Sequence, residues 1–209
     1  MLRLNGGCRR IRRWTSITRP PLSKVICCYW PKVVVPTWIT ALPRSCFSHC
    51  SNLVSIILPV GLTKIEESAF CHCRALTSIH LPCVTTIGER AFADCYALAT
   101  VTLPNVTTIG REAFMGCHAL TSITLPDSAI LCGVRAFAHC RELTTVTLPD
   151  GLWVEDCAFH CCNALDTATQ AAVTARNRDA FDDRSFQERA DERREREASR
   201  SRLNSLYGY

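Results

Sequence analysis

The sequence has no run of about 18 apolar residues, so no part of it is expected to cross a membrane as a helix. Its basic start is not followed by an apolar run of about 7 to 15 residues, which argues against a secretory signal. It also lacks a nucleophile elbow, a phosphate-binding glycine loop and a metal-ligand triad. These absences favour a non-enzymatic protein, for which no cofactor, metal or small-molecule substrate is predicted.

Acidic residues are missing from the first third of the chain. Residues 1 to 65 hold ten Lys or Arg, and the first acid is Glu66. Residues 166 to 209, by contrast, hold nine Arg and nine acids. Two charged flanks of different kinds therefore enclose the middle of the chain.

Residues 1 to 24 are rich in Arg, Ser and Thr, and we expect them to form a disordered basic leader. The same composition is found in mitochondrial transit peptides, although no apolar stripe at helical spacing accompanies it. A nucleic-acid arm is a further alternative, and its affinity would depend strongly on salt. Because Trp14 is the only aromatic residue in this segment, nucleic acid is disfavoured as a partner.

The middle of the chain repeats a motif every 22 or 23 residues, which predicts a solenoid. A phenylalanine, a cysteine three residues later and a leucine three residues after that recur in step. The phenylalanines are Phe47, Phe70, Phe92, Phe114, Phe137 and Phe159, and the cysteines are Cys50, Cys73, Cys95, Cys117, Cys140 and Cys162. These two columns are the predicted structural core. A column of Ile and Val also recurs and fails at Ala168, so the array decays at its end.

Two short strands are expected in each repeat. The pattern from Leu76 to Pro82 alternates apolar and polar residues, as a half-buried strand does, and the proline ends it. The segment from Val106 to Gly110 predicts a second strand that ends in a glycine turn. Phe114, Cys117 and Leu120 follow at a spacing of three, which favours a 3₁₀-like or single helical turn. Stacked repeats would place like strands side by side in parallel.

The pattern divides the chain into four parts. Residues 1–24 are the leader, 25–46 a degenerate repeat that caps the array, 47–169 the regular repeats, and 170–209 a charged helical or disordered tail. A capping repeat is expected because the open end of a solenoid core would otherwise meet water.

The run from Leu81 to Val101, repeated from Leu103 to Ile123, resembles the BspA-type leucine-rich repeat, L-P-x-V-T-x-I-G-x-x-A-F-x-x-C-x-x-L-T-x-I. The resemblance covers about residues 33 to 169. It implies a right-handed leucine-rich-repeat solenoid, a role in protein interaction or adhesion, and no catalytic residues.

The outward side chains of the first strand in each repeat form the candidate binding site, a hydroxyl-rich concave face. They are Ser55, Ser78, His80, Thr100, Thr102, Ser122, Thr124, Thr145 and Thr147. A protein partner of unknown identity is predicted there, because solenoids commonly bind partners on such surfaces. The alternative is that threonine merely suits an exposed strand. The face has almost no charged or aromatic anchor.

The chain has 15 cysteines, an odd total that favours a reducing compartment. We predict a cytoplasmic location, with mitochondrial and cell-surface locations as alternatives. The cysteine column is interpreted as small buried thiols. A zinc site would be nearest at Cys71 and Cys73 with His49 or His72, but the spacing is too tight and half of the ligands are missing, so no metal is predicted.

Overall fold

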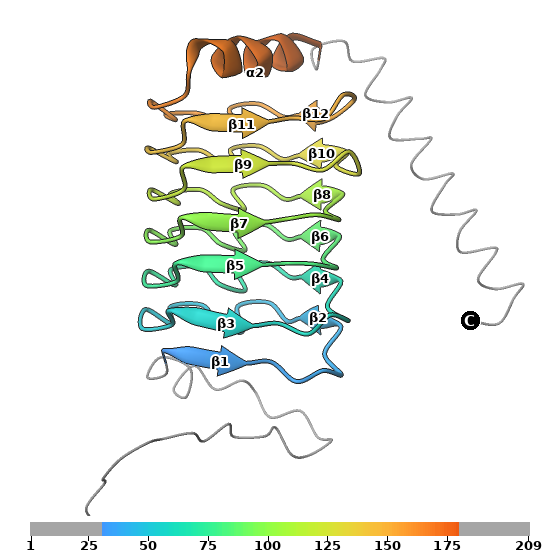
Figure 1. The fold of residues 1–209 in the computed structure, drawn as a ribbon, viewed down its shortest axis with the longest axis vertical. Helices are drawn as coiled ribbons and strands as arrows, with labels where there is room; N and C mark the ends of the chain where they lie inside the picture. The colour runs from blue at the N-terminus through green and yellow to red at the C-terminus, as the bar shows by residue number, and fades with distance from the viewer. Residues whose placement is uncertain (1–30, 180–209) are drawn as a thin grey trace, which may run out of the picture.

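The structure, a computed structural model, describes residues 31–179. In this range the chain winds into a stack of coils, with one helix across its C-terminal end (Figure 1). Every strand pair is parallel, which confirms the solenoid predicted from the repeat. The leader, residues 1–24, lies outside the described residues, as does the tail beyond residue 179.

Each coil begins with a three-residue strand, here called a long strand. Its middle residue points into the core and its two outer residues point to solvent, as the alternating pattern predicts. Together the long strands form one side of the solenoid, which we call the long-strand face. They are β1 (Lys32–Val34), β3 (Ser55–Ile57), β5 (Ser78–His80), β7 (Thr100–Thr102), β9 (Ser122–Thr124) and β11 (Thr145–Thr147).

A proline turn follows, and a two-residue short strand then runs back along the opposite side of the coil. The short strands form a continuous six-stranded sheet in the order β12-β10-β8-β6-β4-β2. They are β2 (Ala41–Leu42), β4 (Lys64–Ile65), β6 (Thr86–Ile87), β8 (Thr108–Ile109), β10 (Leu131–Cys132) and β12 (Trp153–Val154).

The long strands do not form one continuous sheet. They pair two by two, as β1-β3, β5-β7 and β9-β11. No such pairing joins β3 to β5 or β7 to β9, and Figure 1 shows the arrows of β7 and β9 lying further apart than those of β5 and β7. The long-strand face is therefore interrupted twice, whereas the sheet behind it is not.

Tight turns form the third side of each coil, where the sequence predicted 3₁₀-like or single helical turns. The N–H groups of Cys73 and Leu76 donate to the carbonyls three residues earlier, at 3.1 Å in both cases. The turns do not build a helix, because Ser68 and His72 have positive φ angles of 56° and 61°. Other N–H groups donate to the next coil instead, as from Phe70 to the Ala91 carbonyl at 2.7 Å.

The phenylalanine column lies at the centre of the stack. Neighbouring rings are stacked with centroids 5.0 to 5.2 Å apart and planes within 10° of parallel. Phe70, Phe92, Phe114 and Phe137 are fully buried, and the alanine before each of them is also fully buried. The small alanine lets the adjacent backbones approach closely enough for the Phe N–H to reach the next coil's Ala carbonyl.

Glycine ends several of the short strands because the next backbone leaves no room for a side chain. A Cβ atom on Gly110 would lie 2.8 Å from backbone atoms of Gly88 and Glu89 in the preceding coil. Real Cβ atoms are almost never found that close to backbone, so a larger residue would force the two coils apart.

Helix α2 (Thr167–Asp179) covers the last coil (Figure 1). Asp166 caps its N-terminus by accepting bonds from the Thr169 N–H at 2.7 Å and the Thr169 hydroxyl at 2.9 Å. These hydrogen bonds, the one from the N–H first, hold the pKa of Asp166 below its usual range. Val173 is buried, and the failed column residue Ala168 lies in this helix rather than in a strand.

We expect Phe92→Ala or Phe114→Ala to lower the free energy of unfolding by about 3–5 kcal/mol, because each leaves a ring-sized cavity in the stack. Urea denaturation followed by circular dichroism would measure the loss. His80→Ala is the matched control, since His80 lies exposed on β5. Equal midpoints for Phe92→Ala and wild type would contradict the packing described here.

Candidate functional site

The nine side chains of the candidate binding site lie together on the long-strand face. All except Ser55, which is half-buried, are exposed to solvent. The parallel register places them in two rows, in which Ser78 lies beside Thr100 and His80 beside Thr102. The inward residue of each strand, such as Ile79 at 3% exposure, anchors this arrangement in the core. The surface is built of hydroxyl groups, with His80 as its one imidazole.

Sequence reasoning missed an apolar end of this surface. The row that holds His80 and Thr102 begins, in the first two coils, with Val34 and Ile57, which are 43% and 64% exposed and pair in register. Trp38 and Val60, in the turns that follow these strands, are 64% and 76% exposed. The signal was present in the sequence, since Trp38 and Val60 each follow the proline of a turn and belong to no core column.

A groove of about 350 Å³ interrupts the middle of the face, between β7 and β9. Four of the nine predicted residues, Thr100, Thr102, Ser122 and Thr124, line it. The predicted site is thus a surface of three parts: an apolar end, a hydroxyl-bearing face and a groove.

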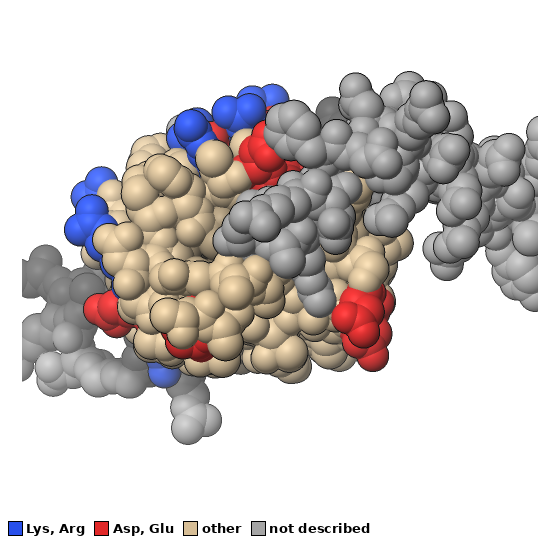
Figure 2. Space-filling model, turned by 90° about the horizontal axis from the view of Figure 1, so that it is seen from above, with Lys and Arg blue, Asp and Glu red and all other residues tan. Residues whose placement is uncertain are grey.

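Charged side chains are scattered over the part of the surface that Figure 2 shows. Figure 2, which looks down on the α2 end, shows Lys and Arg in small groups at the rim, with Asp and Glu at other points and uncharged surface between them. In the described part of the chain, no helix is long and apolar enough to cross a membrane.

The comparisons with known proteins agree with this architecture. The family model described as the BspA type leucine rich repeat region matches six copies, over residues 26–128 and 85–189. Together these ranges span more than half of the chain. The chain belongs to the BspA-type leucine-rich repeat family.

Two solved structures resemble this BspA-type chain. The leucine-rich repeat protein of T. pallidum is 30% identical, with a TM-score of 0.66, and the match covers 69% of each chain. A leucine-rich repeat protein of Eubacterium ventriosum is 31% identical, with a TM-score of 0.60, over 66% of this chain and 38% of the other. No curated protein sequence matches this one.

The cysteines of the cysteine column, here called the ladder cysteines, have a structural role in the BspA-type coil. Each of five thiols donates a hydrogen bond to a phenylalanine carbonyl of the preceding coil, at 3.1 to 3.3 Å. These pairs are Cys73–Phe47, Cys95–Phe70, Cys117–Phe92, Cys140–Phe114 and Cys162–Phe137. A thiol is small enough for the slot and supplies a second donor to a buried carbonyl that also accepts the backbone N–H of the cysteine three residues after it.

Burial raises the pKa of the Cys95 and Cys117 thiols, because a thiolate would lose its hydration in the core. The last ladder pair differs. A hydrogen bond between the two thiols lowers the pKa of Cys162 and raises that of Cys140. Cys157, outside the ladder, is exposed. Burial therefore disfavours the reactive thiolate form of Cys95 and Cys117.

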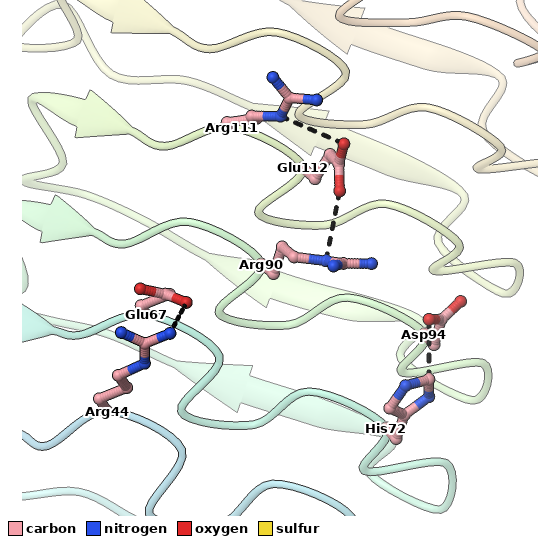
Figure 3. A network of polar contacts seen from close by, with 7 residues as sticks. All are labelled: Arg44, Glu67, His72, Arg90, Asp94, Arg111 and Glu112. Atoms are coloured by element: carbon pink, nitrogen blue, oxygen red, sulfur yellow. Dashed lines mark hydrogen bonds and ion pairs between the residues drawn. The ribbon is translucent and has the colours of Figure 1, made fainter.

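The residues weighed for zinc lie along the tight-turn side of the coils. His49 and His72 stack with centroids 4.6 Å apart, and Nδ1 of His72 lies 3.5 Å from a carboxylate oxygen of Asp94 (Figure 3). Cys71 is buried, and burial raises the pKa of its thiol. Within residues 31–173, no group of three or more His, Cys, Asp and Glu side chains is placed to hold a metal ion.

Ion pairs link neighbouring coils on the same side. The side chain of Glu112 is 10% exposed. Its carboxylate lies 3.2 Å from the guanidinium of Arg90 in the preceding coil and 3.3 Å from that of Arg111 in its own coil (Figure 3). Arg44 and Glu67 make a more exposed pair at 2.7 Å. The Arg90–Glu112 and Arg44–Glu67 pairs join one coil to the next, so they stabilise the stack.

We expect iodoacetamide at about pH 8 to alkylate Cys157 in the native protein at least about tenfold faster than Cys95 or Cys117, whose raised pKa values keep them protonated. Peptide mass mapping would follow each site, with urea-unfolded protein as the control in which all three react. Rapid native labelling of Cys117 would contradict its burial.

Glu112→Gln should lower the free energy of unfolding by about 1–2 kcal/mol, because it removes the charge that two arginines share at a nearly buried position. Glu67→Gln, whose partner Arg44 is exposed, should cost less than about 1 kcal/mol. Chemical denaturation of both variants would measure the difference. Equal losses would show that burial adds nothing to the Glu112 contacts.

Proposed function

We propose that this BspA-type solenoid is a non-enzymatic scaffold that binds a protein partner along the long-strand face. The observation that carries the proposal is the exposure of eight of the nine predicted side chains on the same side of the stack. Solenoids commonly use such extended surfaces for partners.

The apolar end of the face strengthens this proposal. Val34, Ile57, Val60 and Trp38 together offer exposed apolar surface in the first two coils. Aromatic side chains dominate the energetics of protein interfaces, and Trp38 supplies the anchor that the strand residues lack. A partner that contacts this end as well as the hydroxyl rows would combine apolar burial with hydrogen bonds.

The chemistry of the face supports binding rather than catalysis. A serine or threonine nucleophile needs an adjacent base to activate its hydroxyl. Of the nine residues, only His80 has a side chain that could act as such a base. It stands in its row between Ile57 and Thr102, which supply no carboxylate to orient it.

We expect a double variant, Ile57→Arg with Thr147→Arg, to lose the partner that wild-type protein captures by crosslinking in a native extract. Both positions are exposed at opposite ends of the face, so the core is left intact. Ser51→Arg with Asn163→Arg is the matched control, since it adds the same charge on the tight-turn side. The captured protein would then be purified and its affinity for all three chains measured.

Loss of affinity in the first variant alone would support the proposal. Equal affinity for the wild-type chain and both variants would place the partner elsewhere on the molecule and overturn it.

A further inference from the structure

The interruption between β7 and β9, here called the seam, has a cause in the proline turns. In four coils the turn is closed by a bond from the third residue after the proline to the proline carbonyl. These bonds are Ile39–Pro36, Leu62–Pro59, Ala129–Pro126 and Leu152–Pro149. Among the described residues, the coils of β5 and β7 lack this bond after Pro82 and Pro104.

Long strands pair only where the turns that follow them are alike. β1 and β3 both precede closed turns, as do β9 and β11, whereas β5 and β7 both precede open ones. The residue before the proline shows the effect directly. At this position, Val35, Leu81 and Leu125 each donate their N–H to a carbonyl of the next long strand, whereas Leu58 and Leu103 make no such bond. Unlike turns displace the strand ends, and the ladder breaks there.

The seam opens on one side only. Behind it, β8 and β10 remain paired, with Thr108 beside Leu131. The rings of Phe114 and Phe137 in the same two coils stay stacked, with centroids 5.2 Å apart and planes within 4° of parallel. The core and the short-strand sheet therefore fix the groove in place as a rigid feature of the fold.

Main-chain groups on both walls of the groove lack the partners that they have elsewhere. At the other junctions, the residue that corresponds to Thr121 donates its N–H to the preceding coil. Ala99, for example, donates to the Thr77 carbonyl at 2.9 Å. The corresponding bond from the Thr121 N–H to the Ala99 carbonyl is missing. The bond from the Leu103 N–H to the Thr124 carbonyl is missing as well. Leu103 is only 3% exposed, and a buried N–H requires a hydrogen-bond partner.

The lining of the groove shows what it can accept. It consists of five hydroxyl side chains, two prolines and a few small apolar residues, with no charged and no aromatic side chain. The hydroxyls belong to Thr100, Thr102, Thr121, Ser122 and Thr124. Its volume, about 350 Å³, lies within the range of ligand-binding pockets. A ligand that fits must be neutral and must both donate and accept hydrogen bonds.

We propose that the seam binds an extended, uncharged peptide segment of the partner through its main chain. Each wall offers one donor and one acceptor, the Leu103 N–H with the Ala99 carbonyl and the Thr121 N–H with the Thr124 carbonyl, to which the amide groups of an extended peptide lying in the groove can bond. A saccharide fits less well, since the groove offers no aromatic ring for a sugar to stack on. This proposal rests on the proposed function, because it places part of the same partner on the same face.

The seam itself is tested by amide hydrogen exchange followed by NMR. The Leu103 N–H should exchange at least about tenfold faster than those of Leu81 and Leu125, which donate to neighbouring strands. Replacing residues 127–131 by the sequence of residues 105–108 gives the coil of β9 an open turn, like that of β7. We expect this graft to slow Leu103 exchange about tenfold or more. Equal exchange at Leu81, Leu103 and Leu125 in the wild-type chain would overturn the seam.

Binding is tested with a displayed library of random twelve-residue peptides selected on the full chain. The affinity of each labelled selected peptide would be measured by fluorescence anisotropy. Thr102→Arg, which fills the groove, should weaken binding at least about tenfold. Ser51→Arg adds the same charge at an exposed position on the tight-turn side, outside the long-strand face, and should change affinity less than about twofold.

The outcomes separate the two proposals. Peptides that bind the Thr102→Arg chain as tightly as wild type, or a library that yields no binder, would overturn the seam as a peptide site. Binding on a glycan array that Thr102→Arg abolishes would also overturn it and assign a saccharide instead. The scaffold function is judged separately, by whether Ile57→Arg with Thr147→Arg loses the crosslinked partner.

Discussion

The hydrogen bond that five of the column phenylalanines make, from the N–H to the alanine carbonyl of the next coil, is the contact on which the stack depends. It requires an alanine, because a larger residue would hold the backbones apart, and it sets the distance at which the rings stack at 5.0 to 5.2 Å. At this distance the short strands pair, the thiols reach the phenylalanine carbonyls and Glu112 reaches Arg90. Each coil is therefore stable only beside another coil, and α2 supplies the neighbour that the last one lacks.

The repeat predicted the solenoid, the two strands of each coil and the parallel pairing, because a fixed period places identical residues at identical positions. The outward side chains of the long strands could also be read directly, since inward and outward positions alternate along a strand. The tight turns were harder to predict. Positive φ angles at Ser68, His72 and Arg90 follow from hydrogen bonds between coils, and the residue types at these positions do not predict them.

The groove could not be predicted from the columns, because it arises from a difference between repeats. The inward residues of the long and short strands are nine residues apart in the coil of β3, from Ile56 to Ile65, and eight apart in the coil of β5, from Ile79 to Ile87. The last coil also has the spacing of eight, from Val146 to Val154, yet its turn at Gly151 is closed. Turn length alone is thus insufficient, since the long strands that pair are those whose proline turns are both closed or both open. Trp38 escaped prediction for a related reason, since it lies in a turn and belongs to no column.

The matching of turns has a consequence for how such arrays change in number over evolutionary time. Two coils with like turns make a matched unit, and a gene duplication that copies both of them adds a unit whose internal ladder is intact. Copying a single coil preserves the core but can set an open turn beside a closed one. Selection for a binding groove and selection for an unbroken sheet would therefore favour different duplications of the same sequence.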